Sequence, residues 1–162
     1  MNPKEFNDWW KNLGCNSLFF DKALKGKPRP VGESGVIFHS KGNNIKEYSW
    51  GIGKNTNNGV EWLALIKGLE LVKNLGIEDL ANLGYSMMVI KEARNLSKNQ
   101  KKPKTKTHHI LKCMVDEYKA INFLHLLRAN NQQADIMANK GVDLECDVLV
   151  LDQKVFLRNW IP

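Results

Sequence analysis

Three acidic residues stand where carboxylates from distant parts of the chain could meet. Asp21 ends a short aromatic run, and Glu61 and Asp135 each lie in the first turn of a segment with helical periodicity. Metal-assisted hydrolysis needs several carboxylates at one point, because Mg²⁺ prefers compact anionic oxygens. Each acid also suits a structural role, since turn residues follow strands and the macrodipole favours acids at helix N-termini. The spacing alone leaves a shared metal site and three separate structural roles open.

The first half of the chain has the pattern of strands followed by one helix. Three short apolar or alternating runs, at 18–20, 36–38 and 48–52, are separated by turn residues. Runs this close together predict strands that pair antiparallel. Beyond Asn57-Asn58, apolar residues recur at three and four positions until Gly76. This period predicts an amphipathic helix of about four turns, with the asparagines as its cap.

The second half alternates strands and helices. Strands are expected at 80–83 and 123–127, and helices after Ser86, around 111–118 and around 134–138. The later strand is apolar on both faces, as a central strand would be. The strand, helix, strand order predicts that the fourth strand is parallel to the first. The tail from Asp143 to Pro162 has one apolar run and no assignable pattern.

Four stretches resemble the ribonuclease H type I family, most of all its plant reverse-transcriptase-associated branch. They are Phe20-Asp21 with Lys25-Gly26-Lys27-Pro28, Gly35-Val36-Ile37, the run from Asn57 to Leu65, and the run from Arg128 to Asp135. The similarity extends from about Leu18 to Gly141. We therefore expect an N-terminal extension at 1–17, a ribonuclease H-like domain at 18–141, and a C-terminal extension at 142–162 that packs on or follows the domain.

The resemblance implies an α/β fold, with a mixed five-stranded sheet flanked by helices. In that sheet strands one to three are antiparallel, and strands four and five are parallel to strand one. It also implies a nuclease that cuts the RNA strand of an RNA/DNA hybrid with two Mg²⁺ ions held by four carboxylates. Position by position, Asp21 matches the acid that bridges the metals, Glu61 matches the second acid, and Asp135 matches the fourth.

The third acid of the family is missing from this chain. Where the family has Glu-Gly-Asp-Ser, the sequence has Leu83-Gly84-Tyr85-Ser86, so Tyr85 stands at the Asp position. A neutral phenol is longer than a carboxylate and offers Mg²⁺ no negative charge. Lys22 and Leu24 also replace the small and hydroxyl-bearing residues that approach the RNA strand in the family motif. We therefore expect a nucleic-acid-binding domain with weakened Mg²⁺ or Mn²⁺ binding and impaired cleavage.

Two alternatives stay open. One of the neighbouring acids Glu78, Asp79 and Glu92 could compensate for Tyr85 and leave an active hybrid ribonuclease. The fold could instead be a non-catalytic protein-interaction module that presents Trp9-Trp10 and the tail.

The charge balance favours an anionic partner. The 162 residues contain 24 Lys and Arg against 17 Asp and Glu, a net charge of +7, and residues 97–107 hold five lysines and no acid. Such a strip would bind phosphates without reading sequence, or would be a solvated linker. The residues expected to contact nucleic acid are Lys22, Lys25, Lys27, Asn57, Asn58, Lys101, Lys102, Lys104 and Lys106.

The remaining features favour a reduced, intracellular monomer. The three cysteines, Cys15, Cys113 and Cys146, are far apart and predict free core thiols rather than disulfides or a zinc site. His125 is expected as a hydrogen-bonded core residue. No apolar run approaches the roughly 20 residues that cross a bilayer, and no secretory signal is visible. The run 101–104 fits a short nuclear-import pattern, so a nuclear or cytoplasmic location is expected.

Overall fold

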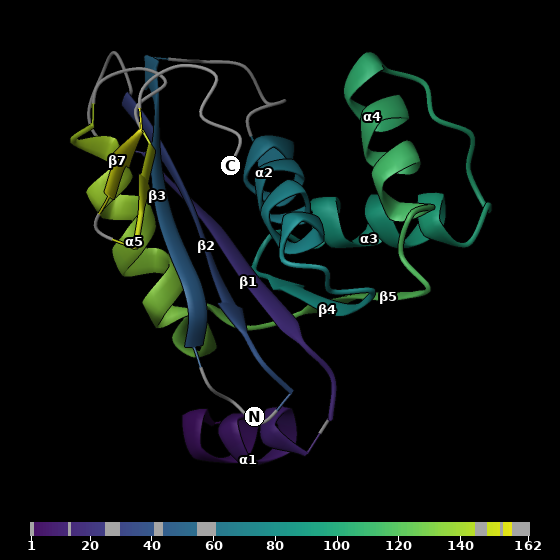
Figure 1. Cartoon of the computed structure of the whole chain (residues 1–162), viewed down its shortest axis with the longest axis horizontal. Helices are drawn as coiled ribbons and strands as arrows, with labels where there is room; N and C mark the ends of the chain where they lie inside the picture. The colour runs from purple at the N-terminus through teal and green to yellow at the C-terminus, as the bar shows by residue number, and fades with distance from the viewer. Residues whose placement is uncertain are drawn as a thin grey trace.

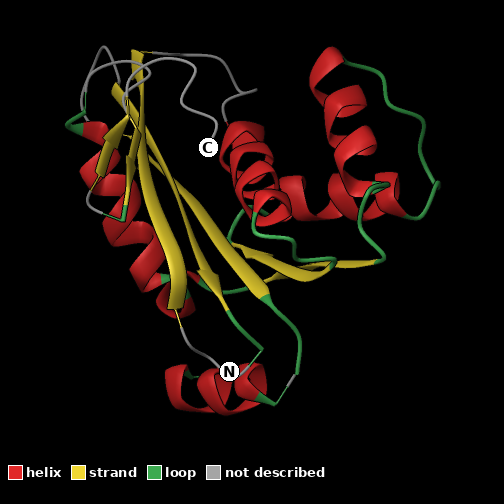
Figure 2. Ribbon diagram, in the orientation of Figure 1, coloured by secondary structure: helices red, strands yellow, loops and turns green. Residues whose placement is uncertain are grey.

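A seven-stranded sheet carries helices on both faces (Figure 1, Figure 2). The computed structural model describes residues 2–12, 14–24, 30–40, 44–54, 61–144, 149–152 and 154–156. The helices are α1 (Pro3–Lys11), α2 (Glu61–Asn74), α3 (Met87–Ser97), α4 (Lys106–Val115), the 3₁₀ turn η2 (Arg128–Asn130) and α5 (Gln132–Val142). The strands are β1 (Ser17–Leu24), β2 (Pro30–Phe38), β3 (Asn44–Lys54), β4 (Asp79–Gly84), β5 (Ala120–His125), β6 (Leu149–Leu151) and β7 (Lys154–Phe156).

The strand β1 lies where the sheet changes from antiparallel to parallel pairing. It pairs antiparallel with β2 and parallel with β4, while β3 continues the antiparallel side and β5 the parallel side. The full order is β5-β4-β1-β2-β3-β6-β7. The predicted mixed α/β fold, with three antiparallel strands and two strands parallel to the first, is confirmed.

Two details of the predicted sheet are wrong. The sheet has seven strands instead of five, because the tail adds β6 and β7 beyond β3. This pairing supplies hydrogen-bond partners to a strand edge that would otherwise be open. The strand β5, predicted to be central, forms the opposite edge of the sheet. It is apolar on both faces because Phe123 packs into one core cluster and Leu124 against the other.

The two faces of β1 enter separate apolar layers. Leu18 and Phe20 join the cluster formed with α2, α3 and α4, whereas Phe19 joins the cluster formed with α1 and α5. Side chains of a strand alternate between faces, so Asp21 belongs to the same face as Phe19. The alternation therefore directs the first candidate acid toward α5, the helix that carries Asp135.

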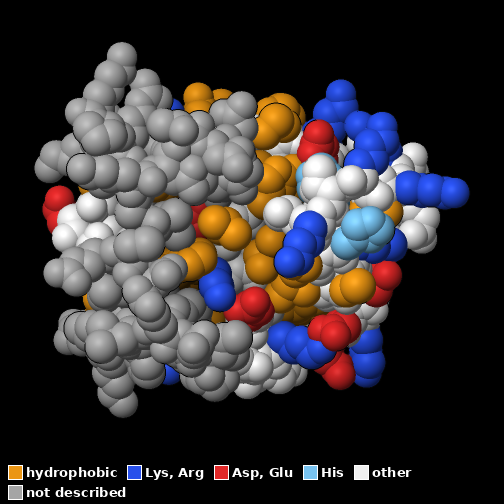
Figure 3. All heavy atoms as spheres, turned by 90° about the horizontal axis from the view of Figure 1, so that it is seen from above, with side chains coloured by type: hydrophobic (Ala, Val, Ile, Leu, Met, Phe, Trp, Pro, Cys, Tyr) orange, Lys and Arg blue, Asp and Glu red, His pale blue; other side chains and the backbone are white. Residues whose placement is uncertain are grey.

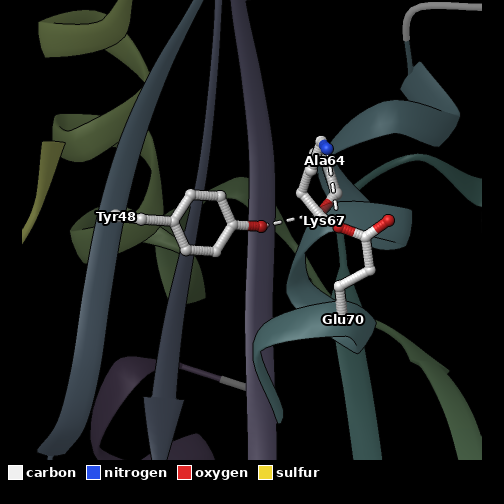
Figure 4. Close-up of polar contacts among 4 residues, drawn as sticks. All are labelled: Tyr48, Ala64, Lys67 and Glu70. Carbon is white, nitrogen blue, oxygen red and sulfur yellow. Dashed lines mark hydrogen bonds and ion pairs between the residues drawn. The ribbon is translucent and has the colours of Figure 1, made fainter. Parts of the chain in front are cut away.

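A buried tyrosine helps to fix α2 on the sheet. The Tyr48 hydroxyl donates a 2.6 Å hydrogen bond to the Ala64 main-chain oxygen, as Figure 4 shows, and Lys67 pairs with Glu70 along the same helix at 3.4 Å. Burial raises the pKa of Tyr48 well above its ordinary value, so the phenol stays protonated and keeps its donor. A Cβ on Gly68 would lie 3.1 Å from the Tyr48 hydroxyl oxygen, so the ring passes close to the backbone of α2 at this point. The sheet and α2 are thus locked together.

Close contact through glycine also seats α5 on the other face. A Cβ on Gly32 would lie 2.2 Å from the Ala138 main-chain oxygen, so only glycine fits there without displacing the helix. Ser34 and Ser49 of the sheet donate hydrogen bonds to the main-chain oxygens of Ala134 and Met137. These contacts fix how closely α5 packs on the sheet and where it lies along the strands. They therefore also fix the position of Asp135, which α5 carries.

The aromatic residues of α1 pack inward. Trp10 donates a 2.8 Å hydrogen bond from Nε1 to Ser17 Oγ, and its ring lies edge-on to Phe19 and Phe38. Trp9 packs against the same cluster. Trp50 and Trp62 are buried in the core on the opposite face.

The cysteines only partly match their prediction as core thiols. Cys15 is a free, half-buried thiol, whereas Cys113 is free and exposed, so the core assignment of Cys113 is wrong. Cys113 lies on α4, an outer helix that turns only one stripe of residues toward the core. Cys146 lies outside the described residues. No helix within the described ranges is long and apolar enough to cross a membrane.

Candidate active site

A cavity of about 390 Å³ opens where β4 ends beside β1. The last residue of β4, Gly84, pairs with Phe20, but β1 continues to Leu24. The carboxyl ends of parallel strands at such a switch of strand order are common ligand sites in α/β folds. The lining residues are Phe20, Asp21, Lys22, Ala23, Tyr85, Ser86, Arg128, Asp135 and Asn139.

The Asp21 side chain is half-buried in the wall of this cavity. Burial raises its pKa from 3.8 to about 6, and the charge of Asp135 and a side-chain hydrogen bond with it add to the rise. Two groups oppose the rise: the Lys22 amide, which donates to Asp21 Oδ1 at 2.8 Å, and the positive charge of Arg128. Asp21 and Asp135 therefore form a close carboxyl pair, in which the negative charge of Asp135 disfavours ionisation of Asp21.

The position of Asp135 follows from the start of α5. Its amide donates to the Asn131 main-chain oxygen at 3.0 Å, and the buried Asn131 side chain donates to the Phe20 main-chain oxygen. Asn139, one turn later, donates to the Asp135 main-chain oxygen at 2.9 Å. The first turn of α5 is thus tied directly to the middle of β1, next to Asp21.

Tyr85 lines the same cavity at the end of β4. Its side chain is 42% exposed, and the Arg128 guanidinium carbon lies 4.8 Å from the centre of its ring. His125, half-buried at the end of β5, has its ring centre 6.1 Å away. Where the family resemblance places a third acid, the structure therefore has an aromatic ring stacked with a cation.

The other acids are not seen at this cavity. Glu61 begins α2, but its side chain lies outside the described part of the structure. Glu78 pairs with Lys119, Asp79 accepts from Asn16, and Glu92 lies 3.2 Å from His108. Among the described residues, no group of three or more His, Cys, Asp or Glu side chains could hold a metal ion. None of the three acids considered as a replacement for Tyr85 lines the cavity.

The predicted nucleic-acid contacts fall into three groups. Lys22 lines the cavity, and Lys101, Lys102, Lys104 and Lys106 are exposed on the loop between α3 and α4 and at the start of α4. Figure 3 shows Lys and Arg side chains gathered at the end of the molecule where α4 lies. Lys25, Lys27, Asn57 and Asn58 lie outside the described residues.

Sequence reasoning assigned no role to three residues that build the site. Arg128 stacks on Tyr85, Asn131 joins α5 to β1, and Asn139 lines the cavity. Arg128 and Asn131 belong to the Arg-Ala-Asn-Asn-Gln-Gln-Ala-Asp run that carries the resemblance. The signal was therefore present in the motif, but the roles depend on contacts with distant strands.

Known proteins match most of this chain. The family described as reverse transcriptase-like matches residues 19–141. Ribonuclease HI of Halobacterium salinarum is 28% identical over 125 residues, which are 77% of this chain and 63% of that protein. Ribonuclease H of Legionella pneumophila is 31% identical over 139 residues, covering 78% of this chain and 95% of that protein. The chain thus spans less than two thirds of the halobacterial protein.

Solved structures have the same fold. The crystal structure of the Halobacterium salinarum RNase H1 has a TM-score of 0.67 and 25% identity, covering 80% of this chain and 98% of that chain. The structure of LC11-RNase H1 in complex with RNA/DNA hybrid has a TM-score of 0.64 and 26% identity, covering 79% and 96%. Together with the match over residues 19–141, these likenesses show that the chain belongs to the reverse transcriptase-like family of ribonuclease H type I proteins.

Proposed function

We propose that this domain binds RNA/DNA hybrids and cleaves the RNA strand slowly or not at all. The observation that carries the proposal is the place of Tyr85, which lines one cavity with Asp21 and Asp135 and lies against the Arg128 guanidinium. Charge stabilisation by metal ions needs anionic ligands at this point, and a phenol stacked with a cation supplies none. The fold and the binding cavity are retained while the chemistry is weakened.

The substrate class is supported by the relatives and by the charges of the chain. Two relatives are called ribonuclease H, and the LC11 enzyme was solved with an RNA/DNA hybrid. In this chain, Lys22 and Arg128 line the cavity and four lysines are exposed between residues 101 and 106. Such cations would hold phosphate groups of a duplex without selecting its sequence.

Among the described residues that line the cavity, the donors fit one divalent ion better than two. Asp21 and Asp135 bring their carboxyl groups into hydrogen-bonding contact and would hold Mg²⁺ or Mn²⁺ after losing the proton between them. A bound ion would polarise the scissile phosphate and lower the pKa of the attacking water. Tyr85 offers no anionic oxygen, and Arg128 brings positive charge into the same cavity, which opposes a second cation.

The decisive experiment is hybrid cleavage by the unmodified chain and by Tyr85→Asp, in Mg²⁺ and in Mn²⁺. The unmodified chain should cut slowly or not at all in Mg²⁺, with partial rescue by Mn²⁺, whose coordination is more forgiving. Tyr85→Asp should bind the metal more tightly and cut faster, because it returns one negative charge to the cavity.

Asp21→Asn in the Tyr85→Asp background is the control and should remove the cleavage gained. Robust Mg²⁺-dependent cutting by the unmodified chain, abolished by Asp21→Asn, would overturn the proposal. It would show that another oxygen does the work of the missing acid and that the chain is an active hybrid ribonuclease.

A further inference from the structure

We propose that Tyr85 and Arg128 together form a nucleotide-binding subsite that takes one sugar-phosphate unit of the bound nucleic acid without a divalent cation. The inference rests on the proposed function, since it assigns the ligand to the same cavity. It differs from the site that the family resemblance implies, because there the metal ions, and not the protein, neutralise the phosphate at this point.

The stacked geometry prepares Arg128 for a phosphate. The guanidinium carbon lies 4.8 Å from the centre of the Tyr85 ring, within the roughly 6 Å over which a cation is attracted to a ring face. The N–H donors of a guanidinium form a rigid planar fork, and the contact with the ring holds this group in the cavity. Those donors match two phosphate oxygens at once, which a lysine ammonium cannot do.

The Tyr85 ring offers a surface for the sugar or base of the same unit. The side chain is 42% exposed although its ring contacts both Arg128 and His125. Aromatic rings bind nucleotides by packing against their flat or apolar parts, without selecting the base. The ring therefore offers an apolar contact for the sugar, and the guanidinium beside it offers a cationic contact for the phosphate.

Four exposed apolar side chains are close in sequence to residues that line the cavity. Large exposed hydrophobic side chains lie within two residues of the lining residues Tyr85, Ser86, Arg128 and Asp135: Met87 (55% exposed), Met88 (48%), Leu127 (54%) and Ile136 (56%). Apolar side chains next to a nucleic-acid site pack against sugars and base edges. The same residues would also suit a protein partner, which the experiment below separates from nucleic acid.

The charges of the described lining residues also allow a phosphate to enter without metal. Two cations, Lys22 and Arg128, balance two acids, Asp21 and Asp135. A site of four carboxylates would repel a phosphate until cations had bound. In addition, Ser86 lines the cavity and caps α3 by accepting from the Val89 amide at 3.4 Å, and the first turn of α3 has no acid. A helix N-terminus of this kind favours an anion.

The test is hybrid binding by fluorescence anisotropy, in EDTA and in Mg²⁺. The unmodified chain should bind about equally in both, within about twofold. Arg128→Gln and Tyr85→Leu should each weaken binding in EDTA by about tenfold, whereas Tyr85→Phe, which keeps the ring, should not. Tyr85→Asp should make binding depend on Mg²⁺. Lys140→Gln, an exposed α5 position outside the cavity, is the matched loss of one charge and should have little effect.

The outcomes separate this inference from the proposed function. If the unmodified chain binds hybrid only in Mg²⁺, or if Arg128→Gln and Tyr85→Leu bind as tightly as the unmodified chain in EDTA, the subsite does not exist, while the proposed function stands. If no variant binds hybrid in either condition although all are folded by circular dichroism, both proposals fail. The exposed apolar side chains would then be assigned to a protein partner.

Discussion

The Asn131 side-chain amide donates a 3.0 Å hydrogen bond to the main-chain oxygen of Phe20, one residue before Asp21. Asn131 is only 2% exposed and directly precedes α5, the helix that carries Asp135. The bond joins two segments that are 111 residues apart in sequence. It therefore holds the two acids of the cavity in register, although Asn131 itself does not line the cavity.

Replacing Asn131 with alanine should destabilise the domain by about 1–3 kcal/mol, because the buried Phe20 oxygen loses a donor. Urea unfolding measures this loss. Asn139→Ala is the control, since its side chain also donates to a main-chain oxygen, at 2.9 Å, but in an exposed position. Exposed bonds contribute little, so the control should lose less than about 0.5 kcal/mol. Equal losses for the two variants would contradict the anchoring role of Asn131.

Asp21 should make the domain less stable as the pH rises. Burial, helped by Asp135, raises its pKa from 3.8 to about 6, so the folded state keeps a proton that the unfolded chain has lost. The stability from protonated Asp21 is complete below pH 3.8 and is lost as the pH rises through about 6. At about 1.4 kcal/mol for each pKa unit, the loss approaches about 3 kcal/mol near neutrality.

The Asp21→Asn variant tests this pH dependence, because the amide cannot ionise. Urea midpoints measured across the window should fall for the unmodified chain and stay flatter for Asp21→Asn, which should be the more stable of the two at neutral pH. Asp8→Asn, at an exposed α1 position, should keep the slope of the unmodified chain. Parallel curves for the unmodified chain and Asp21→Asn would show that the Asp21 carboxyl is not held in its protonated form.

The parts of the fold that could be predicted are those with a clear period. The apolar run of β1, the alternation in β3 and the three- and four-residue spacing of α2 are all patterns of residues close together in sequence. The strands β6 and β7 have three residues each, too few for a period, and exist through pairing with β3. The edge position of β5 could not be predicted from the sequence, because an edge strand that is covered on both faces has the same composition as a central strand.

The candidate site divides in a similar way. Asp21 and Asp135 could be selected from motifs, because each acid sits in a run whose spacing is recognisable. The function of Arg128 could not, because it depends on a ring at the end of β4 reaching a turn between β5 and α5. The sequence predicts that Tyr85 replaces a metal ligand, but the contact of its ring with Arg128 is a three-dimensional relationship that no local pattern contains.

Gly32→Ala should displace α5 from the sheet. A Cβ there would lie 2.2 Å from the Ala138 oxygen and 2.3 Å from the Val142 nitrogen, both main-chain atoms that move only with the helix. We expect a loss of about 1–3 kcal/mol or more in urea unfolding. Gly68→Ala is the matched control. Its Cβ would meet the flexible end of Leu18 at 2.4 Å, and alanine in a helix interior gains about 1 kcal/mol over glycine. A loss at Gly68 as large as that at Gly32 would contradict this explanation.

The exposed lysines between α3 and α4 should set the salt dependence of nucleic-acid binding. Each lysine that contacts a phosphate releases a counterion, so the logarithm of affinity falls with the logarithm of salt by a slope of about 0.9 for each contact. Replacing Lys101, Lys102 and Lys104 with glutamine should therefore flatten the slope by up to about 2.7. Anisotropy titrations with an RNA/DNA hybrid over a range of salt concentrations measure this slope directly.

The matched control replaces three lysines elsewhere, at positions 73, 119 and 140, and removes the same total charge. All three control lysines are exposed and lie outside the α3–α4 loop. Lys73 pairs with Glu117 and Lys119 pairs with Glu78, and Lys140 lies on α5. If the effect came from net charge alone, the two triple variants would lose affinity equally and their slopes would change together. A flattened slope in the loop variant alone would assign phosphate contacts to the loop, because counterion release counts contacts and not total charge. An unchanged slope in the loop variant would make residues 97–107 a solvated linker and leave the cavity residues Lys22 and Arg128 as the principal phosphate contacts.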